Sequence, residues 1–299
     1  MRKLLELKNL SVAYKEKQVL IDLSLTAEQG EIIGLVAPNG TGKTTLFNVI
    51  SNAIKPTSGS VTVDNQYTYQ KEKQELAIYR KLATFPDQSE LFEGLSGVDH
   101  LRLYADMWKG SREHLPAITA ALKMDHYVKK KVHTYSLGMR QRLCFAMMAA
   151  ADTSIMLLDE VMNGLDIENV SIISEQLLDF KRQNKLVFVA SHLLKNLDLY
   201  ADRVLYLRDG HFIHEQKYDE KQIDYLKVEM DQKQYSQLSV SHPLPENHLY
   251  LANHLLCVPL EQMNAKQQTE WIELLLNYKG KDLSIGPLGT LEYYEKFYG

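Results

Sequence analysis

The segment from residue 31 to residue 52 constrains the fold more than any other part of the chain. Glu31 to Val36 has the composition of a buried strand, Ala37 to Gly42 form a glycine-rich loop, and a helical pattern runs from Lys43 to about Asn52. In this order, backbone N–H groups of the loop and of the helix N-terminus converge on one point, where an anion can bind. The segment therefore predicts an α/β fold built around a phosphate-binding loop.

The residues of this loop fit a nucleoside triphosphate and Mg²⁺. Gly40 and Gly42 allow the backbone to approach the phosphates without an intervening Cβ. Lys43 supplies a positive charge to the β- and γ-phosphates, and the Thr44 hydroxyl is a Mg²⁺ ligand. The strict pattern has glycine at position 37, whereas this chain has Ala37, and we expect its methyl group to strain the loop entrance and weaken nucleotide affinity. The predicted nucleotide-binding residues of the loop are Asn39, Gly40, Thr41, Gly42, Lys43, Thr44 and Thr45.

Two carboxylates follow a second apolar run, Ile155 to Leu158. At the end of a buried strand beside the loop, Asp159 can hold Mg²⁺ directly or through water. Glu160 is placed to polarise an attacking water as a general base. The alternative is an ordinary acidic turn at the end of a strand.

Strands alternate with helices along most of the chain. A helix at about 168–183 separates Ile155 to Leu158 from a further strand, Leu186 to Ala190, which predicts a mostly parallel sheet. Residues 57–70 have strand character, residues 95–151 have helical character, and a hairpin at 204–213 closes the domain. We expect a P-loop NTPase core over 1–217, with an antiparallel β subdomain and a helical subdomain at about 87–150.

After residue 218 the composition shifts. Strand candidates lie around 225–229 and 249–259, and helical patterns lie at 267–278 and from Thr290 onward. This predicts a small α+β accessory domain over 218–299, which could brace a dimer or bind a regulator.

Bulk properties exclude several classes of protein. The 299 residues carry a net charge of −4, which argues against nucleic acid as the main partner. Cys144 and Cys257 are far apart and fit neither a metal site nor a disulfide framework, which favours a reducing, cytoplasmic compartment. No stretch approaches the roughly 20 apolar residues of a membrane helix, and the N-terminus lacks a signal-peptide core. If the protein works at a membrane, we expect another chain to hold it there.

The string from Tyr135 to Leu143, Tyr-Ser-Leu-Gly-Met-Arg-Gln-Arg-Leu, resembles the signature segment of the ATP-binding cassette (ABC) family. Asp159-Glu160, Asn163-Gly-Leu-Asp166 and Ser191-His192 follow it in the order of that family. The resemblance covers roughly residues 4–215. It implies that the chain binds and hydrolyses ATP with Mg²⁺ as cofactor.

The resemblance also assigns roles around the γ-phosphate. His192 corresponds to the switch histidine that contacts this phosphate, although a lone histidine at a strand end is more often structural. Ser136 is a good helix N-cap, and with Gly138 it would bind the γ-phosphate held by a second subunit. Leu137 and Met139 replace the usual glycine and glutamine, which puts a polar contact from position 139 in doubt.

Other assignments leave alternatives open. Tyr14 lies where the family places an aromatic ring on the adenine, but it could equally be an ordinary surface or core tyrosine. The metal and γ-phosphate sensor falls at Asp87, with Gln88 one residue later, and either could serve; a simple turn is the alternative. Asp166 belongs to the loop that crosses the dimer interface, where we expect a structural and communicating role.

The family pattern implies a transport motor. Two ATP-binding subunits, identical or different, would close head to tail around two ATP molecules, and residues 89–101 would push on a separate membrane permease. The signature variant and the closing string Gly289 to Phe297 resemble the exporter branch. The chain would then be a cytoplasmic protein bound peripherally to the inner face of the cell membrane, with no nucleic acid partner. The alternatives are a cassette ATPase that acts on ribosomes or DNA, or an ATP-binding module that does not hydrolyse. The substrate cavity would lie in the permease, so this sequence does not specify the substrate.

Overall fold

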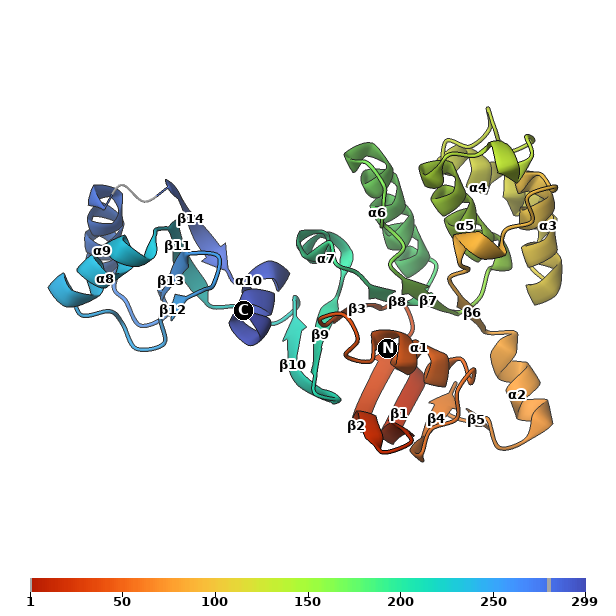
Figure 1. Cartoon of the computed structure of the whole chain (residues 1–299), viewed down its shortest axis with the longest axis horizontal. Helices are drawn as coiled ribbons and strands as arrows, with labels where there is room; N and C mark the ends of the chain where they lie inside the picture. The colour runs from red at the N-terminus through yellow and green to blue at the C-terminus, as the bar shows by residue number, and fades with distance from the viewer. Residues whose placement is uncertain (1, 279–280) are drawn as a thin grey trace. The chain divides into compact units, whose positions relative to one another are not determined.

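A computed structural model describes residues 2–278 and 281–299 of the chain, so Met1 of the predicted first domain lies outside the described residues (Figure 1). The chain divides into two compact units, Met1–Lys217 and Tyr218–Gly299. No helix within the described ranges is long and apolar enough to span a bilayer. Each unit is described by itself below.

A six-stranded sheet forms the centre of the first unit. Its order is β10 (His211–Lys217), β9 (Arg203–Arg208), β3 (Ile32–Val36), β8 (Leu186–Ala190), β7 (Ile155–Asp159) and β6 (Leu82–Thr84). All neighbours run parallel except β10, which is antiparallel to β9. Every residue of β3 and β8 is buried, as expected of parallel strands covered on both faces. The predicted mostly parallel sheet is confirmed.

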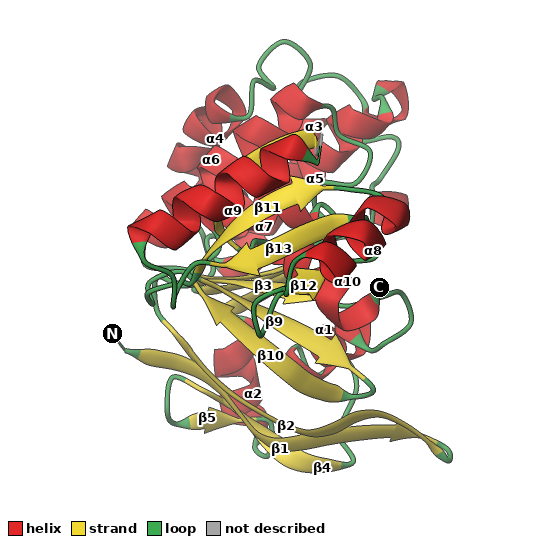
Figure 2. Ribbon diagram, turned by 90° about the vertical axis from the view of Figure 1, so that its left-hand side faces the viewer, coloured by secondary structure: helices red, strands yellow, loops and turns green. Residues whose placement is uncertain are grey.

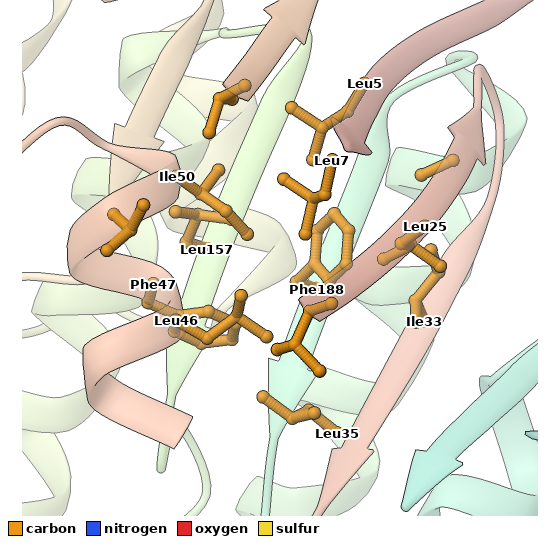
Figure 3. Close-up of a cluster of buried hydrophobic side chains, with 14 of the residues drawn as sticks. Leu5, Leu7, Leu25, Ile33, Leu35, Leu46, Phe47, Ile50, Leu157 and Phe188 are labelled. Atoms are coloured by element: carbon orange, nitrogen blue, oxygen red, sulfur yellow. The ribbon is translucent and has the colours of Figure 1, made fainter. Parts of the chain in front are cut away.

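A four-stranded antiparallel sheet lies in the same unit, in the order β2 (Lys17–Glu28), β1 (Lys3–Tyr14), β4 (Ser58–Val63) and β5 (Tyr67–Thr68). Its apolar face shares a core with helix α1 (Lys43–Ile50) and the central sheet (Figure 3). Leu5 and Leu7 of β1 belong to this core, and Phe47 of α1 meets Phe188 of β8 edge to face with ring centroids 6.3 Å apart. This packing fixes the helix that follows the phosphate-binding loop.

The remaining helices of the first unit are α2 (Glu72–Tyr79), α3 (Gly97–Trp108), α4 (Leu115–Ala121), α5 (Leu137–Ala151), α6 (Ile167–Arg182) and α7 (Leu194–Tyr200), with 3-10 turns at Gln88–Glu90, Arg112–His114 and Val132–Thr134. A capping box between Ser96 and Asp99 starts α3, and Asp166 caps α6 by accepting a hydrogen bond from the Asn169 N–H at 2.8 Å. The helical stretch expected at 95–151 is thus several short helices joined by capped turns.

The second unit has the order β11 (Asp224–Glu229), α8 (Gln232–Ser241), β12 (Leu249–Tyr250), β13 (Leu255–Pro259), α9 (Ala265–Asn277), β14 (Lys281–Pro287) and α10 (Thr290–Tyr298). Its antiparallel sheet has the order β12-β13-β11-β14, which is the β-α-β-β-α-β arrangement of ferredoxin-like folds with one helix added. Leu226 and Val228 share a core with Leu238 of α8 and Leu275 of α9, and Tyr225 packs in a second cluster with Tyr293 of α10. Figure 2 shows the strands and helices of this unit. The predicted α+β character of this part is confirmed.

The structure refines several individual elements. The strand character expected at 57–70 is confirmed as β4 and β5, separated by a turn in which Asp64 and Asn65 have φ near 57° and 59°. The strand candidate at 249–259 consists of β12 and β13, with His254 at φ 63° between them. The helix from Lys43 ends at Ile50, close to its expected end, and Asn52 beyond it is left-handed at φ 62°.

Candidate functional site

The phosphate-binding loop joins β3 to α1. Gly42 has φ 114°, and a Cβ there would lie 2.9 Å from the Leu20 side chain, so only glycine fits. No side chain caps the start of α1, so its first N–H groups remain available to an anion. Lys43 is 7% exposed, and its ammonium donates to the carbonyls of Ala37 at 2.6 Å and Pro38 at 3.2 Å. Burial lowers the pKa of Lys43, because the buried positive charge is poorly solvated. A bound phosphate would stabilise that charge.

Ala37 shows none of the strain expected from its methyl group. Its backbone lies outside the left-handed region, and its side chain is 3% exposed within the hydrophobic core of the unit. Alanine therefore suits this position, because its methyl group belongs to the hydrophobic core. The structure shows no backbone strain at the loop entrance, and the effect of Ala37 on nucleotide affinity stays a prediction.

Two predicted Mg²⁺ ligands, Thr44 after the glycine-rich loop and Asp159 at the end of β7, lie in contact. The Thr44 hydroxyl donates to Asp159 Oδ2 at 2.8 Å, although 115 positions separate the two residues. Desolvation raises the pKa of the Asp159 carboxyl, so its negative charge carries a cost that a bound cation would relieve. Hydroxyl and carboxylate oxygens are the donors that Mg²⁺ prefers, and these residues therefore fit the ion.

Glu160, the predicted general base, is held on both sides of its carboxylate. His192 Nε2 lies 3.1 Å from Oε1, and the Asn163 amide donates to Oε2. The backbone of Glu160 is left-handed, with φ 52°, and its N–H donates to the carbonyl of Ala190 at 2.9 Å. A non-glycine residue in this region is strained, and such strain is typical of functional positions. The geometry aims a partly exposed carboxylate at the same place as Asp159.

The loop after β6 brings the two sensor candidates to one pocket. This pocket has a volume of about 640 Å³, and its lining includes Thr44, Asp87, Gln88, Asp159 and Glu160. Asp87 caps the following turn by accepting from the Ser89 N–H at 2.7 Å, and these hydrogen bonds to Ser89 lower its pKa. The Gln88 amide instead donates to Gln141 Oε1. Both candidates therefore reach the pocket, but each has a different second partner.

The signature segment begins a helix, as its serine predicted. Ser136 caps α5, and its hydroxyl accepts from the Met139 N–H at 3.4 Å. Leu137 is 60% exposed and lines the same pocket. It also lies against the loop after Glu160, because a Cβ added to Gly164 would come within 3.0 Å of it. A Cβ on Gly138 would lie 3.7 Å from Leu165, an ordinary contact distance.

Other predicted residues stand apart from the pocket lining. Tyr14 ends β1 opposite Lys17 and is 46% exposed, so the structure leaves both the stacking role and an ordinary surface tyrosine open. Ser136 is exposed at the start of α5, as a group that meets a second subunit must be.

Sequence reasoning missed two residues of the site, Asn163 and Gln141. The Gln141 side chain is 3% exposed and its Nε2 donates to the carbonyls of Glu160 at 3.2 Å and Val161 at 2.7 Å. It shares a buried stripe of α5 with Cys144, Phe145 and Met148. A polar residue within an apolar helical stripe was the available signal.

Comparison with known proteins decides the family. A family model described as "ABC transporter" matches residues 20–163. The chain is 33% identical over 226 residues to the uncharacterized ABC transporter ATP-binding protein YhcH of Bacillus subtilis, covering 75% of this chain and 73% of that protein. The chain belongs to the ABC transporter family of ATP-binding proteins.

Further relatives and solved structures agree with this membership. The lantibiotic transport ATP-binding protein SrtF of Streptococcus pyogenes is 26% identical, over 72% of this ABC protein and 92% of SrtF. The SkfA peptide export ATP-binding protein SkfE of Bacillus subtilis is 30% identical, over 69% and 86%. The dimeric ABC transporter cassette MJ0796 matches with a TM-score of 0.65 and 25% identity, over 73% of this chain and 100% of that one. The first unit is an ABC ATPase cassette.

Proposed function

We propose that this ABC protein is the ATP-hydrolysing motor subunit of a transporter, and that it drives export through a separate permease chain. The observation that carries the proposal is that Thr44, Asp159 and Glu160 line one pocket, with His192 in contact with Glu160. Thr44 bonds to Asp159 at 2.8 Å, and Glu160 meets His192 at 3.1 Å. A metal-binding pair beside a carboxylate oriented by histidine is the arrangement that phosphoryl transfer to water requires.

The residues divide the work of hydrolysis among them. Open N–H groups of the loop and Lys43 would bind the β- and γ-phosphates, with Tyr14 against the adenine. Thr44 and Asp159 would hold Mg²⁺, joined by Gln88 or Asp87, and the bound ion would neutralise charge on the phosphate oxygens. Glu160 would accept the proton of the attacking water, and His192 would orient Glu160 and contact the γ-phosphate.

A second ATP-binding subunit, identical to this one or different, would complete each site. Ser136 and Gly138 at the start of α5 would bind the γ-phosphate held by the other subunit, because a helix N-terminus attracts anions. The relatives of known structure support this view. MJ0796 is described as a dimer, and also in a dimeric post-hydrolysis state bound to ADP and Pi, with a TM-score of 0.62 and 25% identity.

Export is supported by the relatives SrtF and SkfE, one described for lantibiotic transport and the other for SkfA peptide export. The permease would hold this subunit at the inner face of the cell membrane. Residues 89–101 would then transmit dimer closure to the permease when ATP binds, and release it when the γ-phosphate leaves.

Affinity purification from gently solubilised membranes tests the transporter assignment. We expect the tagged wild-type chain to bring down a polytopic membrane protein in stoichiometric amount, and the Glu160→Gln variant to retain it more firmly in the presence of ATP. Recovery only with ribosomal or DNA-bound partners would overturn the proposal. A recovered permease complex without ATP turnover would leave an ATP-binding module that does not hydrolyse.

A further inference from the structure

Gln141 is a buried amide between two loops of the site. Its Nε2 donates to the carbonyls of Val161 at 2.7 Å and Glu160 at 3.2 Å, and its Oε1 accepts from the Gln88 amide. The side chain is 3% exposed and borders the same pocket as Gln88, so the protein supplies most of its hydrogen-bond partners. One side chain thus joins the sensor loop after β6 to the segment that carries the predicted general base.

The chemistry of the partners fixes the direction of this chain of hydrogen bonds. Backbone carbonyls only accept, so the NH₂ group of Gln141 must face Glu160 and Val161, and its oxygen must face Gln88. Gln88 must therefore donate through its own NH₂ group. Its Oε1 is then the end that remains for the pocket, where an oxygen suits a cation or a water molecule.

The backbone that Gln141 holds is the strained one. Glu160 has φ 52°, a conformation that persists only where its surroundings over-determine it. The Glu160 N–H donates to Ala190 at 2.9 Å, and its carbonyl accepts from Gln141 and also from the Asn163 N–H at 3.1 Å. These three hydrogen bonds form a clamp on the backbone of Glu160. Gln141 is the member of the clamp that also contacts Gln88 of the sensor loop, so a movement of Gln88 changes the hydrogen bonding of the clamp.

We propose that Gln141 is a positioning residue that couples the sensor loop to the general base: its amide keeps Glu160 aligned only while Gln88 occupies its oxygen. This inference rests on the hydrolytic part of the proposed function. When Gln88 moves, the buried oxygen of Gln141 loses its partner, and the amide must shift or rotate away from the two carbonyls. The coupling is reciprocal, so the alignment of Glu160 also biases the position of Gln88.

Kinetics of matched variants test the proposal in the full chain. Gln141→Leu keeps the volume and removes every hydrogen bond, and we expect kcat to fall about 10- to 100-fold, as when a supporting residue of a site is lost, with the KM for ATP within about threefold. The control is Gln216→Leu. Gln216 is also 3% exposed and accepts from the Tyr206 hydroxyl at 2.8 Å, but it lies in β10. Equal losses of kcat in the two variants would overturn the proposal.

A double-mutant cycle separates coupling from simple damage. We expect Gln88→Leu to lower kcat, and Gln88→Leu with Gln141→Leu to lower it little further than the worse single variant, because the two residues act as one unit. Additive losses would mean that Gln141 supports Glu160 without communicating with the sensor loop, which contradicts the proposal.

Amide hydrogen exchange gives a readout that does not need turnover. In Gln141→Leu we expect the amides of Glu160 and Asn163 to exchange at least about tenfold faster, with a smaller effect in Gln88→Leu and none in Gln216→Leu. If the wild-type chain has no ATPase activity but Gln141→Leu still exchanges these amides faster, the proposed function fails and the role of Gln141 in holding Glu160 stands. If the wild-type chain is active but exchange is unchanged in Gln141→Leu, the role of Gln141 fails and the proposed function stands.

Discussion

The two units of this chain treat their shielded charges differently. In the first, Lys43 donates to two backbone carbonyls, and burial displaces the pKa values of Lys43 and Asp159 toward the uncharged forms. In the second, Lys227 and Glu292 form an ion pair at 2.8 Å, with side chains 13% and 18% exposed. This pair is satisfied internally, as is the Arg203–Glu31 pair of the first unit, at 2.6 Å with side chains 13% and 15% exposed. The candidate site of the first unit instead keeps charges whose expected partners are a phosphate and a cation.

The same contrast extends to the backbone. The first unit keeps Glu160 at φ 52° next to Asp159, whereas the second fills an ordinary core with Leu226, Val228, Leu238 and Leu256, each fully buried. His254 of the second unit is left-handed too, at φ 63°, but it lies in a turn between β12 and β13 rather than in the candidate site. Backbone strain at a functional position is tolerated at a cost in stability. Substitutions in the two units should therefore separate loss of activity from loss of stability.

The largest effect is expected at Glu160. Glu160→Gln keeps the size of the side chain and an oxygen that can accept from Asn163, but it removes the base, so kcat should fall about 10²- to 10⁴-fold. Thermal unfolding should be almost unchanged. Steady-state ATPase assays and melting curves measure both quantities. A melting temperature that falls as well would make Glu160 structural and weaken the contrast between the units.

Leu238 should show the opposite behaviour. Leu238→Ala removes a fully buried side chain from the core of the second unit, which should cost about 2–5 kcal/mol of unfolding free energy. ATP affinity should stay within about twofold, since no ligand-binding residue changes. Leu276→Ala, at a side chain 57% exposed in α9, is the control and should change stability little. Denaturant unfolding measures the stability of each variant, and nucleotide titration measures its ATP affinity. A loss of ATP affinity in Leu238→Ala alone would show that the units communicate.

Replacing Asp159 should lower Mg-ATP binding and raise the stability of the nucleotide-free chain. Its pKa is raised above the ordinary 3.8, so the ionised carboxylate lowers stability as the pH rises from that value through the folded pKa. Asp159→Asn, which can still accept from Thr44, should therefore stabilise the nucleotide-free chain at pH 7 by roughly 0.5–2 kcal/mol. Denaturant unfolding at pH 7 and near pH 4 should show this gain shrinking in acid.

The same Asp159→Asn variant should lose most of the stabilisation that Mg-ATP gives the wild-type chain, because stabilisation by a ligand follows its affinity. A variant that is less stable than the wild-type chain at pH 7 without nucleotide would mean that the charge at position 159 is already compensated. The first unit would then resemble the second.

The smallest effect is expected at Ala37. Ala37→Gly deletes a buried methyl group and frees the unfolded chain, and should cost about 1 kcal/mol. The ATP dissociation constant should change less than about twofold, since glycine and alanine present the same N–H group. Isothermal titration and denaturant unfolding compare the two. A clear gain of affinity in the glycine variant would restore the expected strain at the loop entrance.

What the sequence predicted well depends on local chemistry. The strand, glycine-rich loop and helix that begins Lys43-Thr44 were predicted within one segment, and so was the apolar strand that ends in Asp159, whose carboxylate the structure places against Thr44. The alternation of strands and helices was enough to indicate the parallel sheet. Family resemblance then supplied the order of the remaining motifs, and comparison with relatives confirmed the membership.

What the sequence did not predict depends on tertiary contact or on weak patterns. The bonds of Gln141 to Gln88 and to Glu160 join positions 53 and 19 residues apart, and no local rule pairs them. Helix α8 was missed because it buries only Leu238, which leaves no clear apolar stripe. The turn at Asp64-Asn65 carries two residues that tolerate the left-handed region, so its signal was present but was not used. The turn at His254 has no glycine, and its left-handed residue gives a weaker signal.

The contact between Leu137 and the loop at Gly164 sets a rule for how this branch of the family can diverge. A side chain at 164 would need both a left-handed backbone, φ 73°, and the space that Leu137 occupies. A lineage could exchange Leu137 for the usual glycine in one step and keep a working loop. A substitution at 164 meets a heavier obstacle, because φ 73° strains any side chain there whatever residue stands at 137. Position 164 should therefore remain glycine in sequence alignments while position 137 varies in size.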